Sequence, residues 1–204
     1  MTLEPIYQIM GQILPFAWLE PTFMKRALLA TVIISPICAS MGVQMINFRM
    51  AFFSDAISHS AFTGIALGVL FNYNPYVTMI LFGLLVSVGI TKVKRGSELS
   101  IDTIIGIFFS AAVALGIAII SARKGLTRNL QAFLYGDVLA VSDSEILWFV
   151  GFFVLVIAFL AYGYNKLILM GISERLAKAD GVTVYVYDYA FALMLALTIA
   201  FSIR

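Results

Sequence analysis

Charged residues are scarce in this chain of 204 residues, at 12% of the sequence, while hydrophobic residues make up 62%. The mean hydropathy is correspondingly high, at +1.00. A water-soluble fold of this length needs far more polar surface than this composition supplies. The net charge of +2 is also too small to indicate a nucleic-acid partner. The composition therefore predicts a protein whose solvent is membrane lipid.

Cysteine and histidine occur once each, as Cys38 and His59. A single cysteine excludes a disulfide framework, and a single histidine excludes a closed structural zinc site built from several imidazoles. The sequence has no G-x-x-x-x-G-K-[ST] phosphate loop, and it has neither the G-x-S-x-G nor the H-E-x-x-H pattern of hydrolases. We therefore expect no enzymatic activity and no ATPase site within the chain.

Six apolar runs approach the length needed to cross a membrane. About 20 helical residues, each rising about 1.5 Å, span about 30 Å of hydrocarbon. Backbone groups in lipid must pair within their own segment, so these runs are helices, and the period-two alternation of a barrel is absent. We predict an all-α, polytopic transmembrane bundle that forms a single domain over residues 1–204. The six predicted spans are residues 27–47, 50–71, 76–91, 101–122, 146–164 and 184–203.

Two further apolar segments are too short or too interrupted for a simple span. Residues 5–20 contain Pro15 and are bracketed by acids, so we favour an interfacial helix, with a bent extra crossing as the alternative. Residues 129–141 are expected to form a surface helix or a re-entrant segment. Lysine and arginine divide almost evenly between the two sides of this topology, so charge alone leaves the orientation open.

The most informative stretch is RMAFFSDAISHSAFTGIALG, residues 49–68, which places polar side chains inside an apolar run. Asp55 and His59 are four residues apart, so they lie on one helix face, with Thr63 one turn further along. An ionised carboxylate in lipid costs at least about 2.5 kcal/mol, so Asp55 must face a partner, a cavity or an ion. A carboxylate and an imidazole together can bind a divalent cation such as zinc or manganese. The alternative interpretation is a buried Asp–His pair that holds helices together.

Other polar and small residues have simpler interpretations. Asp102, at the start of the fourth run, is favourably placed against the helix dipole. Asp137 and Asp188 lie near predicted membrane interfaces, where we expect ordinary solvation, and the tyrosines beside Asp188 are expected to be interfacial anchors. Gly64 and Gly68 form a small-xxx-small pair, which we interpret as a helix-packing feature.

The polar segment GISERLAKADGV, residues 171–182, is predicted to form a short amphipathic helix that Ser173 caps and Gly181 ends. Leu176 and Ala177 are expected to lie together on this helix, with charged residues displayed around them. Such a helix can dock into a groove of a partner protein, and the alternative is a solvated connector. The candidate docking residues are Ser173, Glu174, Leu176, Ala177 and Gly181.

Four blocks of the sequence resemble the membrane permeases of zinc/manganese/iron-type ABC importers. They appear in the family's order and spacing from about residue 25 to the end of the chain, and the resemblance is closest to the zinc-importing branch. The blocks are RMAFFSDAISHSAFTGIALG (49–68), SIDTIIGIFF (100–109), LQAFLYGDVLAV (130–141) and ISERLAKADGV (172–182).

The resemblance implies a multi-pass permease in the cytoplasmic (inner) membrane of a bacterium, working as a homodimer with a separate cytoplasmic ABC ATPase subunit. An extracytoplasmic metal-binding protein would deliver the ion, which is zinc or alternatively manganese or ferrous iron, and no cofactor would stay bound. Asp55 and His59 match the family's intramembrane acid and histidine on the metal path. Residues 172–182 match the loop that couples to the ATPase, which implies that this loop lies on the cytoplasmic side.

The sequence departs from the family pattern at its end. Family members continue past the equivalent of TIAFSIR with at least two further helices, whereas this chain stops at Arg204, so we expect it to be C-terminally truncated relative to the family. Two other functions stay open at this point. One is an ion-coupled secondary transporter in which Asp55 and His59 relay protons. The other is a non-transporting membrane assembly partner.

Overall fold

The computed structural model describes residues 3–13, 16, 19–122 and 138–203, and every regular element in these ranges is a helix. This confirms the predicted all-α class. The helices are α1 (Glu4–Ile13), α2 (Thr22–Asn47), α3 (Phe53–Phe71), α4 (Pro75–Gly96), α5 (Ile101–Ala122), the 3-10 helix η2 (Val138–Ala140), α7 (Asp143–Ile172), α8 (Glu174–Ala179) and α9 (Val184–Ser202).

Five of the described helices are long and apolar enough to cross a membrane, namely α2, α4, α5, α7 and α9. They coincide with five of the six predicted spans. The remaining run, 50–71, forms the 19-residue helix α3, which is not among the five. Its first half holds the polar residues Ser54, Asp55, Ser58, His59 and Ser60, and these lower its apolar character.

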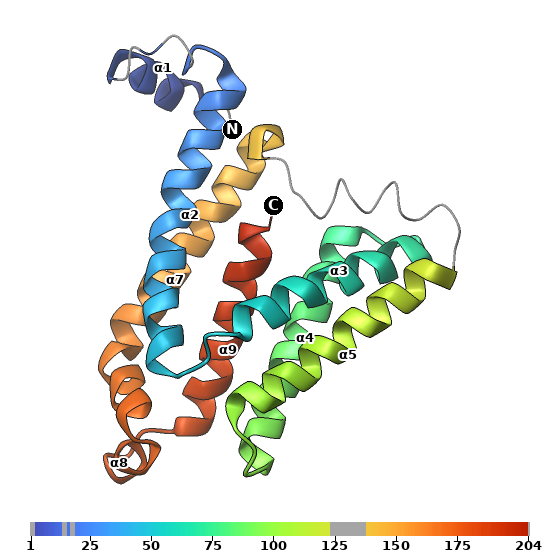
Figure 1. Ribbon diagram of the computed structural model, residues 1–204. Helices are drawn as coiled ribbons and strands as arrows, with labels where there is room; N and C mark the ends of the chain where they lie inside the picture. The colour runs from blue at the N-terminus through green and yellow to red at the C-terminus, as the bar shows by residue number, and fades with distance from the viewer. Residues whose placement is uncertain (1–2, 14–15, 17–18, 123–137, 204) are drawn as a thin grey trace.

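The helices form two groups joined by α9 (Figure 1). In one group α2 lies along α7, and in the other α3 packs on both α4 and α5. Helix α9 contacts α2 and α7 on one side and α3 and α4 on the other. Its Phe191 is fully buried and stacks on Phe48 at the end of α2, with ring centroids 4.7 Å apart. The main core therefore surrounds α9, where the two groups meet.

Helices α3 and α4 pack backbone against backbone at the glycine pair. A Cβ atom placed on Gly64 would lie 2.7 Å from the Cα of Met79, and one on Gly68 would lie 2.9 Å from the Cα of Pro75. On the other side of α3, the buried Thr63 hydroxyl donates to the Ala112 carbonyl of α5 at 2.6 Å. The packing interpretation of the two glycines is confirmed, and α3 is held firmly between α4 and α5.

Helix α1 lies across the end of α2, at the opposite end of the molecule from α8 (Figure 1). Its ten residues extend only about 15 Å, half of the hydrocarbon thickness, which supports the interfacial interpretation of this segment. The Tyr7 hydroxyl donates to Asp143 at 2.8 Å, and Arg26 pairs with the same carboxylate at 2.7 Å. Burial, followed by the hydrogen bond to Asp143, raises the pKa of Tyr7, so its phenol remains a donor.

The predicted element at 129–141 is described only at its end, where η2 covers Val138–Ala140. The rest of that prediction, together with Asp137, lies outside the described residues.

Candidate functional site

Asp55 and His59 line one pocket of about 330 Å³ between α3 and α5. The lining residues follow helical spacing on both helices, so the pocket is formed by two facing helix surfaces. They are Phe52, the residue just before α3, Asp55 and His59 of α3, and Asp102, Ile105, Gly106 and Phe109 of α5. The carboxylate and the imidazole therefore share an open space, as their spacing predicted.

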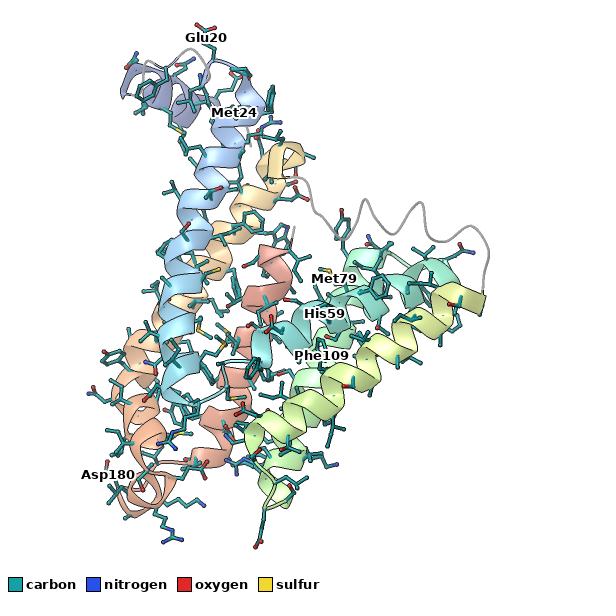
Figure 2. The ribbon with its side chains drawn as sticks, viewed as in Figure 1. Glu20, Met24, His59, Met79, Phe109 and Asp180 are labelled. Atoms are coloured by element: carbon teal, nitrogen blue, oxygen red, sulfur yellow. The ribbon has the colours of Figure 1, made fainter. Side chains whose placement is uncertain are left out.

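The His59 ring meets Phe109 edge to face, with centroids 4.9 Å apart and planes at 83° (Figure 2). This contact orients the plane of the imidazole. Neither Asp55 nor His59 forms a hydrogen bond or ion pair with any residue that the structure describes. Both side chains are exposed on the surface of a single chain. Their donor atoms are thus open toward the pocket.

Asp102 lines the same pocket, which the sequence interpretation as a dipole-stabilising residue did not predict. Even so, no three histidine, cysteine, aspartate or glutamate side chains in the described ranges come close enough together to hold a metal ion. One chain therefore offers the two donors Asp55 and His59 as a partial ligand set. Thr63 is not part of it, because its hydroxyl is turned to α5.

The loop helix α8 forms as predicted. The Ser173 hydroxyl accepts from the Leu176 amide at 3.4 Å, and Gly181 ends the helix with a φ of +76°. The amides of Gly181 and Val182 donate back to the Lys178 and Ala177 carbonyls at 3.1 and 2.9 Å. These two bonds form a Schellman motif, which requires the left-handed conformation that glycine adopts without strain.

Leu176 and Ala177 do not form one apolar patch, contrary to the sequence expectation. Ala177 is fully buried and packs in a cluster with Met170, Val182 and Val184, whereas Leu176 is 56% exposed. Adjacent residues point about 100° apart around a helix, so one seats α8 on the protein and the other is displayed. The exposed surface of α8 carries Leu176 and the half-exposed Glu174.

The expectation that Asp188 is simply solvated is wrong. Asp188 is 2% exposed, and its two carboxylate oxygens accept from Lys94 Nζ and Arg95 Nε, each at 3.0 Å. A buried carboxylate requires such partners, and the end of α4 supplies two consecutive cations. The sequence does contain a signal for this contact. Asp188 is an acid near the start of one apolar run, and Lys94 and Arg95 are cations at the end of another.

Aromatic rings surround the same ion pairs. The Arg95 guanidinium lies 5.1 Å from the centroid of Tyr185, and Lys166 donates to the Tyr187 hydroxyl at 2.9 Å. Lys94 Nζ is also 4.0 Å from a carboxylate oxygen of Glu174 on α8. The tyrosines near Asp188 thus contact cations from α4 and α7.

Several long apolar helices, with an acid and an imidazole lining a pocket between two helices, are features of membrane transport proteins. The chain belongs to the ABC 3 transport family, which matches residues 20–204. It is a multi-pass membrane protein, as the resemblance implied.

Two curated relatives carry metal-transport names. The chain is 29% identical to the high-affinity zinc uptake system membrane protein ZnuB of Haemophilus influenzae over 178 residues, covering 87% of this chain and 68% of ZnuB. It is 35% identical to the manganese import system permease protein ScaB of Streptococcus gordonii over 175 residues, covering 86% of this chain and 63% of ScaB. The chain thus spans about two thirds of the length of these relatives.

Among solved structures, the chain is similar to PsaBC from Streptococcus pneumoniae, determined in complex with a Fab. The two share 28% sequence identity with a TM-score of 0.72, over 99% of this chain and 70% of the other. The similarity therefore extends over the whole helical arrangement described above.

Proposed function

We propose that this chain is the membrane-spanning permease subunit of an ATP-driven importer of divalent metal ions in the cytoplasmic membrane of a bacterium. The observation that carries the proposal is the pocket in which Asp55 and His59 face open space instead of each other or a neighbouring helix. Membership of the ABC 3 transport family supports this proposal. The same membership does not favour an ion-coupled secondary transporter or a non-transporting partner.

For the transported ion we propose zinc, with manganese and ferrous iron as ions that the same donors would accept. An imidazole nitrogen and a carboxylate oxygen are common zinc ligands, and carboxylates also suit manganese. The names of the relatives include both zinc and manganese systems. A two-donor site binds an ion weakly, which suits passage better than storage.

We further propose that two copies of the chain complete the site. A divalent zinc ion prefers four ligands, and two Asp55–His59 pairs related by a two-fold axis would supply them. The exposure of both side chains on a single chain is consistent with a surface that a second copy covers. The pocket would then lie on the dimer axis.

In this proposal a separate ABC ATPase binds the exposed surface of α8, including Glu174 and Leu176, and an extracytoplasmic metal-binding protein delivers the ion. Ser173 and Gly181 hold α8 in shape through their capping bonds, and Ala177 seats it against the bundle. ATP-driven movement of α8 would shift the helices between outward-open and inward-open arrangements around Asp55 and His59.

Metal uptake tests the proposal directly. In a strain that lacks its own zinc importer and grows in chelator, the chain is expressed with its ATPase and binding-protein partners, and accumulated zinc is measured. We expect Asp55→Asn and His59→Ala to abolish uptake, because the first replaces the charged carboxylate by a neutral amide and the second removes the imidazole, while insertion and ATPase association persist.

Ser58→Ala is the matched control, because Ser58 lies on the same helix but lines a different cavity, and it should transport normally. Wild-type uptake by Asp55→Asn or by His59→Ala would remove these residues from the ion path.

A further inference from the structure

The least exposed charged side chain that the structure describes lies outside the Asp55–His59 pocket. Asp188 on α9 is 2% exposed and is held by Lys94 and Arg95 of α4 at 3.0 Å each. Both cations are themselves largely covered, with side-chain exposures of 18% and 26%. We call these three residues the Asp188 clamp. A fork of this kind, with one carboxylate oxygen on each cation, fixes the relative position of two helices more strictly than apolar contacts do.

On one side the clamp is joined to the loop helix. Asp188 lies in the second turn of α9, and only residues 180–183 separate α9 from α8. Ala177 of α8 and Val184 of α9 pack in the same buried cluster as Met170 of α7, so the loop helix, the end of α7 and the start of α9 form one packed unit. Lys94 also lies 4.0 Å from Glu174 of α8, which adds a weaker direct link.

On the other side the clamp is joined to the helix that bears the pocket. Lys94 and Arg95 end α4, whose other half packs backbone against backbone on α3 at Gly64 and Gly68. Helix α3 carries Asp55 and His59. The Asp188 clamp therefore lies between the loop helix α8, whose exposed surface carries Leu176 and Glu174, and α4, which packs on the pocket helix α3.

We infer that Asp188 is a positioning residue which couples displacement of α8 to movement of α3 and α4, and hence to the pocket; this rests on the proposed function. Without the clamp, α8 and α9 can shift while α4 stays behind, because apolar surfaces between helices slide more easily than a forked ion pair. The clamp transmits movement and does not touch the ion. Its loss should therefore separate ATP hydrolysis from transport.

If Asp188 only stabilised the fold, its loss would lower the amount of folded complex without changing the zinc transported per ATP. Replacing a buried ion cluster by apolar residues of similar volume is often neutral for stability, whereas removing one partner leaves a buried charge unpaired. The decisive variant is therefore the triple substitution K94M/R95M/D188L, which removes all three charges together. It is compared with Lys166→Met, which removes a half-buried cation that contacts α9 through Tyr187 but lies outside the clamp.

The complex of the chain with its ATPase is reconstituted in lipid vesicles, and zinc uptake and ATP hydrolysis are measured on the same sample. We expect the triple variant to assemble and hydrolyse ATP while zinc transported per ATP falls about tenfold, within the range usual for coupling between sites. Lys166→Met should keep the wild-type ratio. An unchanged ratio in the triple variant would overturn the inference.

Should the triple variant fail to insert, Lys94→Met decides, because Asp188 keeps Arg95 as its partner there. A fall of about fivefold in zinc per ATP is then expected, at the lower end of such couplings, and an unchanged ratio again overturns the inference. Failure of the proposed function gives a different result. In that case the wild-type complex transports no zinc, or the Asp55→Asn variant transports zinc as well as the wild type does.

Discussion

Substituting Gly64 by alanine should force α3 and α4 apart. The added Cβ would lie 2.7 Å from the Cα of Met79 and 2.9 Å from the carbonyl oxygen of Thr78. Carbon atoms in contact prefer about 3.5–4.0 Å, so the helices must separate by roughly 1 Å. Both opposing atoms belong to the backbone and cannot rotate away. Overpacking of this kind costs about 1–3 kcal/mol, and we expect the upper half of that range.

Alanine also favours the helix by up to about 1 kcal/mol relative to glycine, which leaves a net loss of about 2 kcal/mol. For a chain of this length, such a loss lowers the thermal midpoint by about 4–8 °C. The assay is thermal unfolding of the purified chain in detergent micelles, followed by circular dichroism. Gly151→Ala on α7 is the matched control, because nothing lies within 4 Å of its added Cβ.

The control should melt at or slightly above the wild-type temperature, since it gains helix propensity without a clash. Equal midpoints for Gly64→Ala and Gly151→Ala would show that α3 and α4 are not in backbone contact. Helix α4 would then have no rigid link to the pocket helix α3.

Two further predictions concern the loop helix and the pocket. Gly181→Ala places a side chain at a φ of +76°, which costs about 1–2 kcal/mol. Amide hydrogen exchange in α8 should therefore speed up, while exchange in α9 stays unchanged. Unchanged exchange in α8 would contradict the Schellman motif. Asp102→Asn removes the charge of one of the two carboxylates that line the pocket. We expect the zinc concentration for half-maximal uptake to rise up to about fivefold, with little change in maximal rate. No rise would show that Asp102 is electrostatically remote from the ion.

Periodicity and apolar length were sufficient to predict most of the helices, because a segment in lipid has few alternatives to a helix. They were also sufficient to place Asp55 and His59 on one face, since that follows from local geometry. The loop helix was predictable for the same reason, because its capping residues Ser173 and Gly181 act within one turn of their partners.

What the sequence could not show were contacts between distant segments. Asp188 is separated from Lys94 and Arg95 by 94 and 93 positions along the chain, so the residues around it do not indicate which cations it meets. Asp102 was assigned only a local role, because its place in the lining of the Asp55–His59 pocket depends on how α5 packs on α3. In each case the sequence contained the chemistry, and the packing of the helices determined which groups meet.

The measurement that tests the central claim most directly is the ligand environment of zinc in the purified complex, determined by X-ray absorption. We predict zinc–nitrogen distances of about 2.0–2.1 Å with imidazole scattering in the wild type, and loss of that scattering in His59→Ala, because His59 is the only histidine in the chain. The complex would be prepared without the metal-binding protein. A spectrum of the ATPase alone, recorded with zinc, would show whether histidines of the ATPase contribute to the signal. Zinc bound with an unchanged spectrum in His59→Ala would contradict the account.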